Sequence, residues 1–176
     1  MPTLFLIFGI IKKNYAGSIL EPTWDSAGSE MAAAELTPSQ IVPKDPYIRS
    51  NVDWAAWAFI KGEVPIFTEA PNTGKETATL LHVNADGKWT LISDITSGDT
   101  RTLSYGYNEI LSGNNSAKSE EERAKTSSLF DSFQIADGIS LDNTYTGSIK
   151  VTGTLVQFQG YENITDAANA TSGARF

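Results

Sequence analysis

Residues 77–93 read TATLLHVNADGKWTLIS, and this stretch decides the fold class. Two runs with strand-forming residues, 77–83 and 88–93, flank Asn84-Ala85-Asp86-Gly87, whose composition is typical of a turn. Glycine adopts positive φ without steric cost, so Gly87 suits the turn. The stretch therefore predicts a β-hairpin, and with it a chain that is mainly β.

Further strands are expected on both sides of this stretch. Residues 63–68 indicate a strand with Pro65 at an edge position, and 102–107 alternate with the period of a strand. A last strong strand is expected within 145–161. Together these segments predict an antiparallel β-sandwich or small barrel that spans residues 52–161.

One helix is expected inside this β domain, near residues 117–132. Ser116 or Ser119 can cap its first turn, and the acidic run 120–122 suits the positive end of the helix dipole. Apolar residues are sparse before Leu129, so only the end of this helix is expected to pack firmly.

The two ends of the chain are expected to be arms. Residues 1–51 predict an apolar strand followed by an extended segment with four prolines, and 162–176 predict a flexible polar tail. We expect an assembly arm that adds to the sheet edge of a neighbour, and its residues are Leu4, Phe5, Leu6, Ile7 and Phe8. The equally weighted alternative is an ordinary first strand of the chain's own sheet.

The apolar run is too short for a membrane span, because a helix needs about 20 residues to cross the hydrocarbon layer. The basic pair 12–13 follows the run, whereas a signal peptide carries its basic residues before it.

The composition excludes several classes of site and partner. The 176 residues include no cysteine and one histidine, which excludes disulfides, thiolate metal sites and any site with two histidines from one chain. The formal net charge of −8 argues against a nucleic-acid partner and against an anionic membrane surface. A hydrophobic content of 40% is sufficient for a real core.

No motif assigns a catalytic, cofactor-binding or metal-binding residue. A hydrolase triad would need His82 as its base, and the chain has no Gly-x-Ser-x-Gly motif. A carboxylate-pair enzyme stays open because acidic residues are plentiful, and the pairs considered come from Asp94, Asp99 and Glu109 or from Glu63 and Glu69.

Three tryptophans form a candidate glycan platform, because the apolar face of a sugar ring stacks on an aromatic ring. They are Trp54, Trp57 and Trp89, and we favour a role in the core or in an interface for them. Three glycosylation sequons, at Asn114, Asn163 and Asn169, matter only in a eukaryotic secretory pathway.

These observations predict a non-enzymatic structural subunit of a larger assembly. The specific expectation is a virion component: a capsid-decorating, minor capsid or tail protein. Its partners would be copies of itself or other structural subunits, and it would reside in the virion or outside cells after a cytosolic stage. The alternative is a carbohydrate-binding module.

Overall fold

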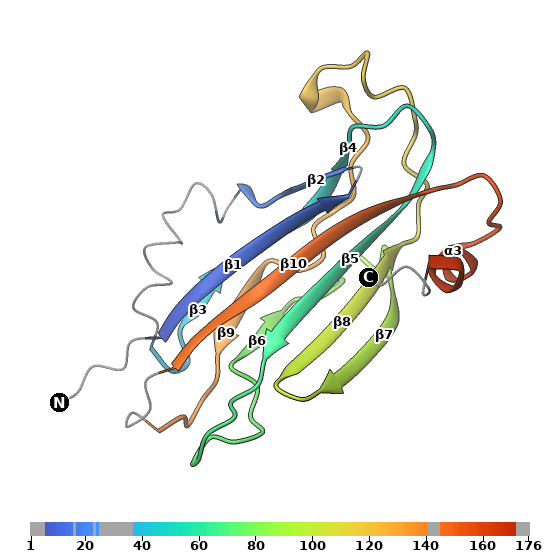
Figure 1. The fold of residues 1–176 in the computed structure, drawn as a ribbon. Coiled ribbons are helices and arrows are strands. Elements are labelled where there is room, and N and C mark those ends of the chain that lie inside the picture. The colour runs from blue at the N-terminus through green and yellow to red at the C-terminus, as the bar shows by residue number, and fades with distance from the viewer. Residues whose placement is uncertain (1–5, 16, 23, 25–36, 141–144, 172–176) are drawn as a thin grey trace.

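The computed structural model describes residues 6–15, 17–22, 24, 37–140 and 145–171. Their strands form a five-stranded sheet and two smaller sheets (Figure 1). The five-stranded sheet has the order β1 (Leu6–Tyr15), β10 (Tyr145–Gln157), β5 (Ala56–Pro65), β8 (Thr100–Tyr107) and β7 (Trp89–Ser97). The smaller sheets are β2 (Gly17–Leu20) with β4 (Tyr47–Ser50), and β3 (Ile41–Pro43), β9 (Ser132–Ile135) and β6 (Ala78–Leu81).

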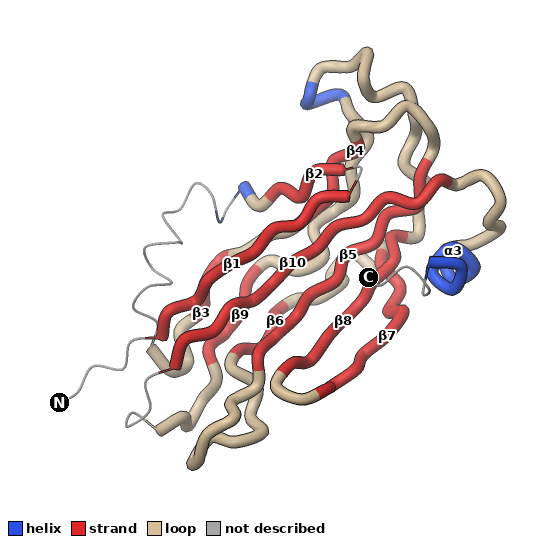
Figure 2. Tube along the Cα trace, viewed as in Figure 1, coloured by secondary structure: helices blue, strands red, loops and turns tan. Residues whose placement is uncertain are grey.

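The smaller sheets lie against one face of the five-stranded sheet, as Figure 2 shows for the strands in red. The core between the layers joins Ile48 and Phe133 from the small sheets to Ile60 and Val151 from the large one. Gly153 of β10 lets the layers close, because an added Cβ would lie 2.7 Å from Cγ1 of Ile19. The predicted fold class, a mainly β sandwich, is confirmed.

Strand β5 is buried on both faces over its first half. Ala58 and Ile60 face the core between the sheets, whereas Trp57 and Phe59 face the opposite side. A strand covered on both faces has a continuous apolar sequence, and this explains why residues 54–60 carry no clear alternation.

The C-terminal segment 162–176 was expected to be a flexible tail, and this is wrong for residues 164–171. They form the helix α3 (Ile164–Thr171), which covers Trp57 and Phe59 on the outer face of the large sheet. The helix fits closely against β8, because an added Cβ at Gly106 would lie 2.4 Å from Cγ1 of Ile164. Its cap is Asn163, whose Oδ1 accepts a hydrogen bond of 2.9 Å from the Asp166 N–H.

The predicted hairpin of 77–83 with 88–93 is wrong in its pairing. β6 pairs with β9 in a small sheet, while β7 pairs with β8 in the large sheet. The turn between them contains three residues with positive φ, at His82, Asn84 and Gly87. These residues turn the chain from one layer of the sandwich to the other, so the two runs never become neighbours.

The predicted helix near 117–132 is also wrong. The only helical turn there is a 3-10 turn, Glu120–Glu122, whose Glu122 carboxylate accepts hydrogen bonds from the Ser119 N–H and hydroxyl. Beyond it the chain is extended, and Leu129 and Phe130 are buried in the main core. The capping signal was real, but no apolar face of helical period follows it, so the segment packs as an irregular chain instead.

The expected extended arm within residues 1–51 is wrong for 17–22 and 37–50. These two described segments supply β2, β3 and β4, and they contribute Ile19, Val42 and Ile48 to the core. Its prolines fit, because Pro43 ends a short strand at the edge of a small sheet. The sandwich therefore begins well before residue 52.

Candidate assembly surface

The N-terminal apolar run forms one edge of the five-stranded sheet. Leu6, Ile7 and Phe8 belong to β1 and pair with residues 145–147, whereas Leu4 and Phe5 lie outside the described residues. β1 runs parallel to β10 over ten residues, from Leu6 opposite Tyr145 to Tyr15 opposite Thr154. The two expectations for this run were an arm on a neighbour and a strand of the chain's own sheet. In the structure its described residues form a strand of the chain's own sheet.

The opposite edge of the same sheet is β7, whose neighbour in the sheet is β8. Two large apolar side chains on this strand face solvent: Leu91 is 50% exposed and Ile95 is 58% exposed. Among the residues whose exposure the structure describes, Ile41 and Ile110 are the other large apolar side chains exposed in this way. The register with β8 shifts between Leu91 and Ser93, which is a β-bulge.

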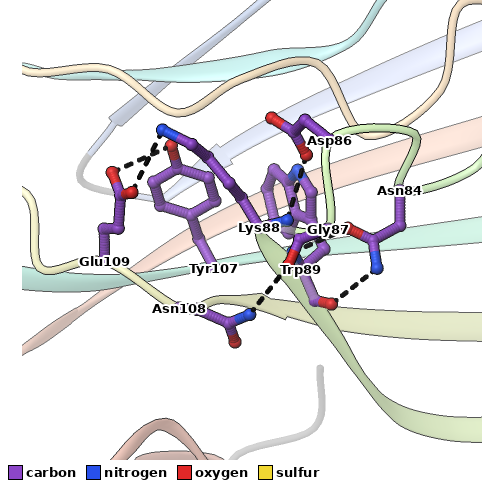
Figure 3. Close-up of polar contacts among 8 residues, drawn as sticks. All are labelled: Asn84, Asp86, Gly87, Lys88, Trp89, Tyr107, Asn108 and Glu109. Atoms are coloured by element: carbon purple, nitrogen blue, oxygen red, sulfur yellow. Dashed lines mark hydrogen bonds and ion pairs between the residues drawn. The ribbon is translucent and has the colours of Figure 1, made fainter.

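The first residue of β7 is covered by a side-chain amide (Figure 3). Asn84 Nδ2 donates to the Trp89 carbonyl at 2.8 Å, and Asn84 Oδ1 accepts from the Trp89 N–H at 2.8 Å. The amide thus makes the two hydrogen bonds that one residue of a neighbouring antiparallel strand would make. We call this arrangement the Asn84 clamp, and it occupies the edge at Trp89.

An ion pair lies beside the clamp. Figure 3 shows Lys88 reaching Glu109, with 3.0 Å between Lys88 Nζ and Glu109 Oε1, and the Tyr107 hydroxyl 3.4 Å from Glu109 Oε2. The Glu109 carboxylate raises the pKa of Lys88 above its usual value through this hydrogen bond. The pair is exposed to solvent, so it adds little to stability and serves mainly to place a fixed charge pair at this end of the sheet.

The clamp can be tested with Asn84→Gly. Asn84 has a φ of 55°, which glycine also adopts, so this variant removes the amide without straining the backbone. We expect the free energy of unfolding to fall by about 1–3 kcal/mol and exchange of the Trp89 amide hydrogen to accelerate, because two hydrogen bonds are lost. The measurements are urea unfolding and amide hydrogen exchange.

The control is Asn114→Gly. Asn114 is exposed and, like Asn84, has a positive φ, here 62°, but it lies outside β7 and the turn before it. Equal protection of the Trp89 amide in both variants would contradict the clamp.

The outer face of the large sheet holds a groove of about 590 Å³ beside α3. Its lining includes the apolar residues Phe59, Ile92, Ile95 and Ala168, together with serines and threonines of β7, β8 and β10. Lys61 lies at its border and contacts Glu63, whose other carboxylate oxygen is 2.8 Å from Lys150 Nζ.

The Lys61, Glu63 and Lys150 side chains form a network with one surplus positive charge. Burial alone would raise the pKa of Glu63, but hydrogen bonds from Lys150 and Lys61 outweigh it and hold that pKa below its usual value. Glu63 therefore stays ionised at neutral pH and is not suited to donate a proton.

The tryptophans do not form an exposed platform. Trp57 is 5% exposed and packs under α3, whereas Trp89 is 3% exposed and belongs to the core between the sheets. Trp54 is half-buried against that same core. A sugar ring needs an exposed aromatic face, so the glycan platform on these three residues is wrong, and the preferred core role fits Trp57 and Trp89.

His82 is exposed and lies in the turn after β6, with its Nδ1 2.7 Å from Asp131 Oδ2. The Ser132 hydroxyl donates to Asp131 rather than to the imidazole, so the three groups lack the order of a hydrolase triad. Among the described residues, no group of three histidine, cysteine or acidic side chains could hold a metal ion.

Three of the five carboxylates considered as acid–base pairs, Asp94, Glu109 and Glu63, contact cations in the structure. Asp94 binds Arg101 through both oxygens, and this hydrogen bonding holds the pKa of Asp94 below its usual value. Arg101 also contacts Glu76 at 2.8 Å. Glu109 pairs with Lys88 and Glu63 with two lysines, so these four carboxylates are arranged as ion pairs.

A buried ion pair was not predicted from the sequence. Lys44 Nζ lies 2.5 Å from Glu21 Oε1, both side chains are 0% exposed, and the ammonium is 5.0 Å from the centre of the Trp24 ring. Each of the two residues follows a short strand and stands beside a proline, a position typical of a surface loop. The local sequence therefore does not mark either residue as buried. The pair joins the segment after β2 to the segment after β3.

Comparison with known proteins identifies no relative. No family model matches the chain, and no curated protein or solved structure is significantly similar to it. Within the described ranges, no helix is long and apolar enough to span a membrane.

Proposed function

We propose that the protein is a non-enzymatic structural subunit of a larger assembly, and that it docks through the edges of its five-stranded sheet. The observation that carries this proposal is β1, a ten-residue strand near the N-terminus that forms an edge and pairs with a single strand of its sheet. An edge strand can pair with a further strand or be exchanged with a neighbour, and both modes join subunits through main-chain hydrogen bonds.

The finer proposal is a virion component: a capsid-decorating, minor capsid or tail protein whose partners are copies of itself or other structural subunits. It would be made in the cytosol of the producing cell and then reside in the virion. The net charge of −8 supports solubility of the free subunit before assembly. The burial of Trp57 and Trp89 removes the main argument for a carbohydrate-binding module.

Deletion of residues 1–13 tests the proposal. We expect the full chain to form oligomers or larger particles, and the truncated chain to lose them and to stay at the mass of one or two subunits, because most of β1 is gone. The measurements are size-exclusion chromatography with light scattering and negative-stain imaging, with circular dichroism to show that the β domain stays folded.

The matched control is deletion of residues 172–176 at the other end of the chain, which leaves every described strand intact. A synthetic peptide of residues 1–16 added to the truncated chain should bind it and restore assembly. Normal assembly of the chain that lacks residues 1–13 would contradict the proposal.

A further inference from the structure

The second edge of the large sheet, β7, lacks the features that usually protect an edge strand. Natural edge strands avoid pairing with other chains by means of lysine, proline, bulges or a covering segment. Residues 89–97 contain no lysine and no proline. Their protection is confined to the start of the strand, where the Asn84 clamp covers Trp89 and the bulge interrupts the register after Leu91.

The remainder of β7, residues 93–97, is regular and open. It pairs without a break with β8, from Ser93 opposite Ser104 to Ser97 opposite Thr100. In the part of the chain that the structure describes, no further strand lies on its other side. Ile95 stands in the middle of this open segment and is 58% exposed. The segment thus has two properties: its main-chain groups can pair with another strand, and an apolar side chain stands at its centre.

We propose that β7 pairs with β7 of a second copy of this chain, antiparallel about a twofold axis at Ile95. This inference rests on the proposed function and names the partner as the chain itself. In this register Ile95 lies opposite Ile95 of the second copy, and Ser93 lies opposite Ser97. Directly opposite residues of an antiparallel pair share one face of the sheet, which this register satisfies.

The charges on β7 also fit this register. The one ionised side chain on the strand, Asp94, would lie opposite Thr96 of the second copy, so two carboxylates do not meet. Arg101 of the same chain already neutralises Asp94, with 2.7 Å between Arg101 Nη2 and Asp94 Oδ2. Arg101 also contacts Glu76, so this cluster keeps one net negative charge. The edge strand itself carries only the paired carboxylate of Asp94 on a protein of net charge −8, so two copies can approach here with little repulsion.

Pairing would join two five-stranded sheets into one continuous sheet. Because Ile92 and Ile95 line the groove beside α3, the grooves of the two copies would lie next to each other on the same outer face. A five-residue ladder buries less surface than a typical stable interface, so the dimer should be weak and concentration-dependent.

The test compares Ile95→Lys with Ile41→Lys. Ile41 is a matched control, because it is 57% exposed and also lies on an edge strand, β3, which is only three residues long and contains Pro43. In the chain that lacks residues 1–13, we expect the mass from light scattering to rise with concentration from that of one truncated subunit toward twice that value. Ile95→Lys should hold the mass at one subunit, and Ile41→Lys should behave as the parent.

The same chain with Ile95→Cys gives a second, independent readout. The protein has no cysteine, so this variant carries a single thiol at the twofold axis. Opposite residues in antiparallel strands are close enough for a disulfide, so oxidation should produce a covalent dimer at least about tenfold faster than in Ile41→Cys.

Any one of three results would overturn the inference. The parent chain could stay monomeric at all concentrations, Ile95→Lys could leave the mass profile unchanged, or the two cysteine variants could crosslink equally. The proposed function fails separately, when removal of residues 1–13 leaves the large assemblies intact.

Discussion

Replacing Lys44 by methionine will lower the free energy of unfolding by about 3–5 kcal/mol, because it removes the ammonium partner of a buried carboxylate. Lys44 and Glu21 are both 0% exposed and lie 2.5 Å apart, so water cannot replace the lost cation at Glu21. Of the ion pairs that the structure describes, this is the only one with both partners buried to this extent. Urea unfolding followed by tryptophan fluorescence measures the change, since Trp24 lies beside the pair.

Two further variants show whether charge is the cause. Lys88→Met removes a lysine whose ion pair with Glu109 is exposed, and it should cost far less stability than Lys44→Met. The double variant Glu21→Leu with Lys44→Met removes both charges, and it should recover most of the stability that the single variant loses. A loss in Lys44→Met as small as that in Lys88→Met would show that the buried pair is not needed for the sandwich.

Phe133→Ala is the second substitution for which we expect a large effect, a loss of about 3–5 kcal/mol. Phe133 is 0% exposed in β9, the central strand of the three-stranded sheet, and its ring lies 6.3 Å from that of Trp24. The truncation leaves a cavity between the two layers of the sandwich, where backbone pairing on both sides limits collapse.

Thermal and urea unfolding of Phe133→Ala should be compared with Phe133→Leu, which leaves less empty volume and should cost less. Phe158→Ala is a useful control, because that ring is only half-buried beside Trp57 on the outer face. Equal losses in Phe133→Ala and Phe158→Ala would contradict the position of the main core between the sheets.

Several individual strands were predictable from the sequence, but their partners were not. Residues 102–107 and most of 145–161 form strands as expected, since alternation and β-branched residues are local signals. The pairing of 77–83 with 88–93 was wrong because the turn between them crosses from one sheet to the other. Proximity in sequence favours a hairpin, but only the three-dimensional packing decides which edge each strand joins.

The helix predictions failed for a common reason. The capping residues near 119–122 were recognised, but without an apolar face they yield only one 3-10 turn. In contrast, α3 has a clear signal that the prediction did not use: Asn163 followed by Asp166 at the first turn, with Ile164, Ala167 and Ala168 on one face. The polar and small composition of residues 162–176 concealed a short amphipathic helix.

The candidate site was predictable only in part. The apolar N-terminal run was recognised as a strand with two alternative locations, and the choice depends on β10, which lies far away in sequence. The open edge of β7 could not be found, because the exposure of Ile95 depends on its strand lying last in the sheet. The tryptophans were ambiguous for a similar reason, since burial is set by the partner layer and not by the local sequence.

The parallel pairing of β1 with β10 also sets an order of events during synthesis. Tyr145, the partner of Leu6, is translated about 140 residues later. At a typical rate of about 5–20 residues per second, the first strand waits roughly 7–30 seconds for the strand that completes its sheet. Pairing between such distant segments also slows folding, because a long loop must close first. A ribosome stalled before residue 145 would therefore carry a nascent chain whose first strand has no partner yet in the five-stranded sheet.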